Sequence, residues 1–282
     1  MTKPMLLRAR VDAPMAAVHQ ALTDAGALRS WLAEYAEVEL PERWVFWGRY
    51  TPEGDAPHQR LLHVDVDTLR FGWLLDGVET TTEIRLGAEN DHTTLITLSQ
   101  THFDMREALA GTTIRGVLQT FWCLSLANLI DHVEGRELTP MCDFTSDTLR
   151  AELTIGAERS TVYESMIDAE QVTQWFGVPM DIEPRVGGSW SMVEHGGAKI
   201  VDLVHDTRLS LDWGGDFGVQ TWELADSGGR TKLTFVHSGF KGRPPYAGWM
   251  GTLAGFAELR RFHEIRNWQP TWLSTPATER QS

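Results

Sequence analysis

The sequence predicts an α+β protein made of two tandem copies of one domain. Each copy is expected to be a curved antiparallel sheet wrapped around a long C-terminal helix, with two short helices after the first strand. One observation is a gap-free internal match in which Trp31 aligns with Trp175 and Asp24 with Asp168. Another is that strand and helix periods follow the same order in both halves. Because the offset is about half of the 282 residues, the repeat is a whole domain and not a short solenoid unit.

The first strand and the two short helices are predicted from local signals. Residues 7–11 alternate apolar and charged side chains, which indicates a strand. Asp12 is expected to cap the following helix, with Pro14 in its first turn. Asp24 is expected to cap a second helix that ends near Trp31. The second copy repeats this plan, so both copies should begin in the same way.

The sheet and the long helix follow in each copy. Over about residues 38–103, two-residue alternation is interrupted by proline and glycine, which is typical of antiparallel strands with one apolar face. Apolar residues then recur at helical steps over residues 114–133, and Gly135 is placed to end this helix. The corresponding helix of the second copy contains Gly248, Gly251 and Gly255. These glycines indicate either a mobile start or close packing on a neighbour, and we favour close packing.

These patterns divide the chain into four parts. We expect a first domain over residues 1–138, a linker over 139–148, a second domain over 149–273 and a flexible tail over 274–282. The tail has no apolar periodicity. Length differences between the copies fall in loops between strands, where insertions cost least.

Composition and charge exclude several partners. A net charge of −14 and a pI near 5.1 repel phosphate backbones, and Lys and Arg form no cluster that offsets this, so we expect no nucleic-acid partner. No apolar run approaches the roughly 18 residues of a membrane span, and the N-terminal stretch carries charges where a signal peptide needs apolar residues. We therefore expect a cytoplasmic protein without a membrane partner.

Motifs of common catalytic and cofactor sites are missing from the sequence. It contains no nucleophile elbow, phosphate loop, dinucleotide-binding glycine run or His-Glu-x-x-His, so we expect no cofactor, no metal and no assignable catalytic residue. Glu37 and Glu39 in the first copy match Asp181 and Glu183 in the second. Side chains two apart on a strand share one face, and here that face is expected to be solvent.

A set of caps, turns and packing residues carries a family resemblance. The set comprises Asp12, Ala13, Pro14, Val18, Asp24 and Trp31 in the first copy, and Ala157, Val162, Asp168, Trp175, Val186, Gly187, Gly188, Trp213 and residues 231–240 in the second. With the order of elements, it resembles the helix-grip fold of START-like (SRPBCC) proteins, which include polyketide-cyclase-like domains. It is most similar to the bacterial branch related to the heat-shock-protein-90 ATPase activator homologue-like family. Such motifs specify a fold and no shared catalytic group.

The resemblance implies a cavity between the curved sheet and the long helix, suited to an apolar guest. The predicted ligand-binding residues are Phe71, Trp73, Leu98, Gln100 and Trp122 in the first copy, and Leu211, Trp213, Trp222, Phe235, His237 and Trp249 in the second. Tryptophans at alternating positions can equally be core residues, and this alternative stays open. Trp31 and Trp175 are expected to be packing residues.

His237 and Gln100 stand at matching positions and are the polar members of the predicted lining. Each could orient a ligand inside an apolar pocket by a hydrogen bond. The alternative is that His237 is a structural histidine bonded to the backbone near a strand end.

Three functions remain compatible with the sequence. The first is binding of a hydrophobic or aromatic small molecule in the predicted cavities. The second, implied by the family resemblance, is a chaperone-linked or other protein-interaction module in which the acidic surface matters. The third is a cyclase- or aromatase-like enzyme, in which His237 or Gln100 steers proton transfer.

Overall fold

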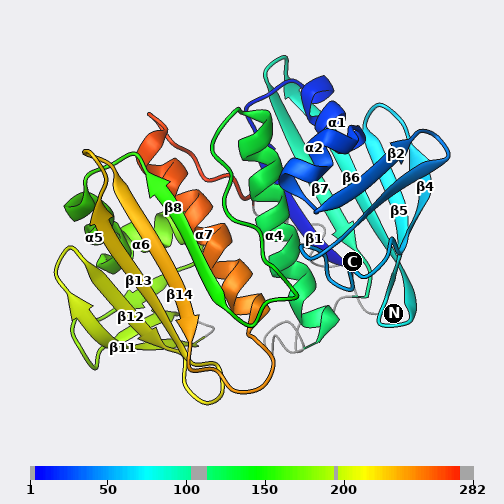
Figure 1. Ribbon diagram of the computed structural model, residues 1–282. Coiled ribbons are helices and arrows are strands. Elements are labelled where there is room, and N and C mark those ends of the chain that lie inside the picture. The colour runs from blue at the N-terminus through cyan, green and yellow to red at the C-terminus, as the bar shows by residue number, and fades with distance from the viewer. Residues whose placement is uncertain (1–3, 103–112, 194–195, 274–282) are drawn as a thin grey trace. The chain divides into compact units, whose positions relative to one another are not determined.

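The computed structural model describes residues 4–102, 113–193 and 196–273 (Figure 1). The predicted tail, 274–282, lies outside the described residues. By contacts, the chain forms two compact units. The first contains Met1–Thr145, Tyr246–Ala254 and Thr271–Ser282, and the second contains Ser146–Pro245 and Gly255–Pro270.

The first copy follows the predicted order of elements. Its elements are β1 (Met5–Val11), α1 (Met15–Thr23), α2 (Ala25–Trp31), β2 (Tyr35–Glu39), β3 (Arg43–Trp47), β4 (Gln59–Val64), β5 (Thr68–Leu75), β6 (Val78–Asn90), β7 (Thr93–Gln100) and α4 (Ile114–Val133). Five strands form an antiparallel sheet in the order β1-β7-β6-β5-β4, and β2 pairs with β3 in a separate hairpin.

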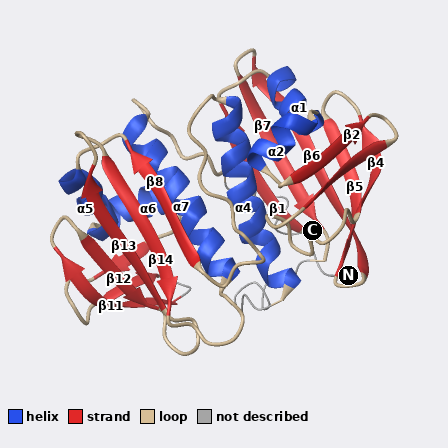
Figure 2. Ribbon diagram, in the orientation of Figure 1, coloured by secondary structure: helices blue, strands red, loops and turns tan. Residues whose placement is uncertain are grey.

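The second copy repeats the plan. Its elements are β8 (Leu149–Ile155), α5 (Arg159–Ile167), α6 (Ala169–Phe176), β9 (Met180–Ile182), β10 (Ser189–Met192), β11 (Gly196–Val204), β12 (Arg208–Asp212), β13 (Val219–Asp226), β14 (Thr231–Ser238) and α7 (Tyr246–Glu264). The sheet is antiparallel in the order β8-β14-β13-β12-β11-β10-β9. In each copy two short helices follow the first strand (Figure 2), so the predicted α+β class and tandem plan are confirmed.

The helix starts confirm two predicted caps and correct a third. Asp24 Oδ1 accepts from the Ala27 amide at 2.7 Å, and Asp168 repeats this contact at the start of α6. Asp12 does not cap α1, because the N-cap position falls on Pro14, two residues further along the chain. The backbone N–H of Asp12 instead donates to Glu134 Oε1.

Two indoles in each copy satisfy carbonyls in the last turn of the first short helix. Trp31 Nε1 donates to the Ala21 carbonyl at 3.0 Å, and Trp175 Nε1 donates to the Ser165 carbonyl at 2.7 Å. Trp44 and Trp190, which lie on β3 and β10, donate to the next carbonyl in each helix. Because the last carbonyls of a helix have no partner within it, these bonds stabilise its end and fix it to the following element.

A glycine turn distinguishes the second copy. The amide of Gly187 donates to the Ile200 carbonyl, and the Gly188 carbonyl accepts from the Ile200 amide, which fastens this turn to β11. Gly187 has φ +83°, and a Cβ on Gly188 would lie 2.2 Å from the Glu183 carbonyl oxygen. The first copy has Pro41 in its turn, and there β2 and β3 still form a hairpin, outside the main sheet.

Both sheets carry a β-bulge at the same place. The register shifts between Leu61 and His63 on β4 and between Ile200 and Asp202 on β11, each strand pairing with its next neighbour along the chain. The bulged residues, Leu62 and Val201, have exposed fractions of 38% and 40%. A bulge bends its strand and increases the local twist, so both sheets are bent at corresponding points.

The glycines of α7 are explained in part by close packing. A Cβ added to Gly255 would lie 3.0 Å from ring atoms of Phe176 and 3.3 Å from Trp175. This confirms the expectation of close packing at Gly255.

Candidate functional site

The predicted lining of the first copy is brought together by the structure. Phe71 and Trp73 on β5, Leu98 and Gln100 on β7 and Trp122 on α4 are all fully buried. The ring centroid of Trp122 lies 6.5 Å from that of Phe71 and 6.0 Å from that of Trp73. Further aromatic rings that pack against this cluster belong to Trp44, Phe46 and Phe121. The aromatic side chains therefore fill much of the space between sheet and helix with one another.

Gln100 is the polar centre of this cluster. Its Oε1 accepts from the Thr82 hydroxyl and, at 3.2 Å, from the Trp122 indole N–H. Its Nε2 donates to Thr80 Oγ1 at 3.1 Å and to the Thr101 carbonyl at 3.0 Å. A carboxamide offers two acceptor positions and two N–H donors, so all four are used within the protein.

The predicted lining of the second copy lies on neighbouring strands. Leu211, Gln220 and His237 form one row across β12, β13 and β14, and Trp222 pairs with Phe235 in the next row. The predicted residues Leu211, Trp222, Phe235 and His237 are buried, whereas Trp213, which follows β12, is only half-buried. Trp249 is buried on α7, in the stretch Tyr246–Ala254 that groups with the first compact unit.

Two further aromatic residues complete the cluster in the second copy. Trp190 on β10 lies 6.3 Å from Trp213 and 5.5 Å from Trp222, between ring centroids. Phe256 on α7 lies 5.0 Å from Trp222 and 5.3 Å from Phe235. The sequence places Phe256 on the apolar stripe of the helix, which could have identified it. Strand β10 is four residues long, too short for its alternation to identify Trp190.

His237 has one satisfied ring nitrogen and one unsatisfied one. Its Nε2 lies 2.7 Å from the carbonyl oxygen of Phe217, and because a carbonyl can only accept, Nε2 carries the proton. Nδ1 is then an acceptor, and it is buried without a hydrogen-bond partner among the described residues. Burial lowers the pKa of His237 to about 4, so its ring is neutral at pH 7. The backbone bond predicted as the alternative is thus present, on one nitrogen.

Two indole donors of the predicted lining in the second copy are unsatisfied as well. Trp213 Nε1 and Trp222 Nε1 are buried and have no acceptor within the described parts of the chain. In the first copy the same holds for Trp73 Nε1. Buried polar groups nearly always find a partner, so each exception indicates either strain or a place for a bound polar group.

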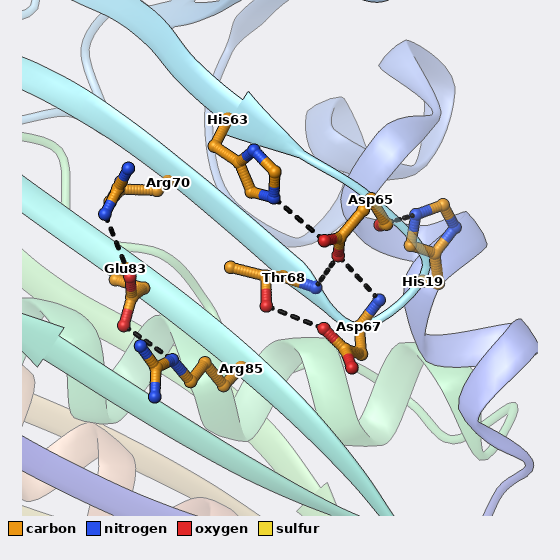
Figure 3. A network of polar contacts seen from close by, with 8 residues as sticks. All are labelled: His19, His63, Asp65, Asp67, Thr68, Arg70, Glu83 and Arg85. Carbon is orange, nitrogen blue, oxygen red and sulfur yellow. Dashed lines mark hydrogen bonds and ion pairs between the residues drawn. The ribbon is translucent and has the colours of Figure 1, made fainter.

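A polar network on the outer face of the first sheet was not predicted from the sequence. Figure 3 shows His63 and His19 reaching the side chain and the carbonyl of Asp65, respectively, and Arg70 and Arg85 flanking Glu83. The side chains around this shallow depression are His63, Asp67, Thr68, Arg70, Glu83 and Arg85. The hydrogen bond from His63 is the largest of the effects that lower the pKa of Asp65 to about 2.

The local role of this network is structural. Asp65 Oδ1 accepts from the amides of Asp67 and Thr68 at 3.1 and 2.8 Å, which fixes the turn between β4 and β5. The charges of the depression pair mainly with one another, and exposed pairs of this kind contribute little to stability.

The paired carboxylates lie where they were expected. Glu37, Glu39, Asp181 and Glu183 are exposed, and Glu37 and Glu183 pair with the neighbouring Arg43 and Arg185.

Within the described residues, no helix combines the length and the apolar composition that a membrane crossing needs.

The topology of the second copy agrees with a sequence match over the same region. The family described as "Activator of Hsp90 ATPase homolog 1-like protein" matches residues 156–260. The second copy resembles this activator-homologue family. The match runs from the turn after β8 to α7 and includes Trp190, Trp213, Trp222 and His237.

Several solved structures are similar to parts or most of the chain. CalU16 from Micromonospora echinospora shares 23% identity over 48% of this chain and 76% of its own, with a TM-score of 0.38. The di-domain ARO/CYC BexL from the BE-7585A biosynthetic pathway shares 17% identity over 94% and 100%, with a TM-score of 0.38. The Aha1 dimer from Colwellia psychrerythraea shares 15% identity over 43% of this chain and 98% of its own, with a TM-score of 0.37. Among curated proteins, no sequence matches this chain.

Proposed function

We propose that the protein binds a hydrophobic or aromatic small molecule between the curved sheet and the long helix. The observation that carries this proposal is the inner face of the second copy, where aromatic rings surround buried polar atoms that lack partners. Binding sites for small molecules combine apolar walls with a few polar groups that fix orientation. Trp190, Trp222 and Phe256 supply such walls, and His237 supplies a polar group.

Mass spectrometry of the intact protein under native conditions tests this proposal. The purified chain is compared with the same chain after gentle organic extraction. A bound mass that extraction removes supports the proposal and reports the class of ligand. Absence of any bound mass, together with absence of binding to added aromatic molecules, would contradict it.

A chaperone-linked role is the second candidate, and the match of residues 156–260 to the activator-homologue family favours it. In that case the outer surface would carry the function, and substitutions on the inner face that preserve the fold would leave chaperone binding unchanged. Calorimetric titration of purified Hsp90 with the protein and with a His237→Phe variant measures this. Chaperone binding that weakens with added salt and ignores the variant would favour the second candidate.

An enzyme of the cyclase or aromatase kind is less well supported by the second copy. His237 is the titratable group among its predicted lining residues, and its pKa of about 4 makes it a weak base at neutral pH. Such a ring is better suited to accept a hydrogen bond than to take a proton away.

A further inference from the structure

Gln100 and His237 occupy equivalent places in the two sheets. Gln100 on β7 pairs with Met5 of the first strand and with Thr82 of β6. His237 on β14 pairs with Leu149 of the first strand of its copy and with Gln220 of β13. Each side chain therefore lies at the same point of its sheet, on the buried face, and their surroundings can be compared directly.

In the first copy this place is closed. Every donor and acceptor of the Gln100 carboxamide is used, by the Thr82 hydroxyl, the Trp122 indole, Thr80 Oγ1 and the Thr101 carbonyl. A ligand would have to break one of these bonds to reach Gln100. The Trp122 indole in addition ties the long helix to the sheet at this point.

In the second copy the same place is incomplete. His237 has an exposed fraction of 4%, and its Nε2–H is held by the Phe217 carbonyl. Nδ1 on the other side of the ring is an acceptor without a partner in the described chain, and the indole donors of Trp213 and Trp222 are likewise unpaired there. Trp222 lies beside Phe235, in the row next to His237.

We propose that the duplication has separated two roles: the second copy holds one ligand, whose hydroxyl donates a hydrogen bond to Nδ1 of His237, and the first copy is a structural core. In that copy Gln100 makes all its hydrogen bonds, although Trp73 Nε1 is buried without an acceptor within the described residues. This proposal rests on the proposed function and names its ligand class, a hydroxylated aromatic molecule. A hydroxyl fits because Nδ1 needs a donor, and a hydroxyl supplies one without bringing a charge into a buried place. A carboxylate cannot donate and would place its charge against the Nδ1 lone pair.

Three naphthalene probes of similar shape separate these chemistries. Calorimetric titration with 2-naphthol, naphthalene and 2-naphthoate at pH 7.5 compares a hydroxyl, no polar group and a carboxylate. We expect one molecule of 2-naphthol per chain, bound at least tenfold more tightly than naphthalene, with 2-naphthoate bound most weakly.

Two variants locate the site. In His237→Phe the preference for 2-naphthol over naphthalene should disappear while naphthalene still binds. Thr82→Val is the matched control, because it removes a hydroxyl that donates to Gln100 in the first copy, and it should leave the affinity for 2-naphthol unchanged. Circular dichroism shows that each variant is folded. If His237→Phe fails to fold, His237→Gln, which keeps polar groups in a similar volume, replaces it and should reduce the preference.

The results distinguish failure of this inference from failure of the proposed function. Two bound molecules per chain, equal affinities for 2-naphthol and naphthalene, or an unchanged preference in the His237 variant would overturn the inference, and the proposed function would stand. Absence of binding by all three probes, with no co-purified mass, would overturn both.

Discussion

Trp122 donates its indole N–H to Oε1 of Gln100 across 3.2 Å, and this bond joins the long helix of the first copy to the last strand of its sheet. Both side chains are fully buried. Because Gln100 also holds Thr80 and Thr82, a single carboxamide connects α4, β6 and β7. The hydrogen bonds of Gln100 therefore stabilise the first copy, whereas His237 at the equivalent place in the second copy makes one such bond, to the Phe217 carbonyl.

Gln100→Leu should destabilise the protein more than His237→Leu. The first substitution leaves the buried Thr82 hydroxyl and Trp122 indole without their acceptor, at a cost of about 1–3 kcal/mol for each group. The second removes one bond to a loop carbonyl and an acceptor that was already unpaired, for a cost of about 1 kcal/mol or less. Urea unfolding followed by circular dichroism measures both. Equal losses would show that the Gln100 network is not a stabilising feature.

Trp31→Phe and Trp175→Phe should each lower the free energy of unfolding by about 1–3 kcal/mol, because each leaves a buried helix carbonyl without its indole donor. Trp47→Phe is the control, since Trp47 stacks on the exposed Tyr35 at a centroid distance of 5.5 Å. The midpoint of urea unfolding is the readout. A control that loses as much stability as the two variants would argue against the helix-end role.

Stability should fall as the pH drops from 6.5 toward 4. Burial lowers the pKa of His237 and of His263 from 6.5 to about 4 in the folded protein. In this window the unfolded chain binds protons that the folded chain does not, so acid favours unfolding, and the contribution is fully present above pH 6.5. For the buried His237 the difference amounts to roughly 3 kcal/mol. Unfolding curves of the wild type and of His237→Gln across this range test it; identical pH slopes would contradict the assignment.

Gly218→Ala should weaken both stability and ligand binding. Gly218 has φ +77°, and a Cβ there would lie 2.3 Å from the Ser238 carbonyl oxygen and 2.5 Å from the Phe240 nitrogen. The strain would displace the adjacent Phe217 carbonyl, which holds His237. Gly228→Ala is the control, because Gly228 has φ +67° but open space around a Cβ. Both variants should lose about 1 kcal/mol of stability, because each places a side chain at a positive φ. Titration with 2-naphthol should show weaker binding in Gly218→Ala only.

The features that the sequence predicted most accurately are those that depend on residues close together in the chain. Asp24 and Asp168 cap their helices through amides three residues away, and such contacts can be read from a short stretch of sequence. The prediction that Asp12 caps α1 was wrong for a local reason too, because the chain stays extended through Pro14 before α1 begins. The internal repeat supported these predictions, because most predicted elements of one copy have a counterpart in the other.

The polar details of the site required the three-dimensional structure. The contact of His237 with Phe217 spans 20 residues, and that of Trp122 with Gln100 spans 22. The alternation of β7 and β14 predicted that Gln100 and His237 lie on the inner face. Whether the polar atoms of these two side chains find partners depends on loops and on the long helix that packs against the sheet. The sequence could therefore identify two equivalent polar positions without revealing that one is satisfied and the other is not.

The bulges at Leu62 and Val201 also determine how the strands tolerate changes in length. A residue inserted in the strand shifts every side chain beyond it to the opposite face, so each bulge absorbs one position and keeps the inner set in phase. The residues on either side of Leu62 and of Val201 pair with consecutive residues of the neighbouring strand, so deleting either one would leave a regular strand whose inner side chains still face inward. The exposed leucine and valine thus mark the points at which each strand can lose one residue without turning its inner side chains outward, and the expected effect of the deletion is a straighter strand.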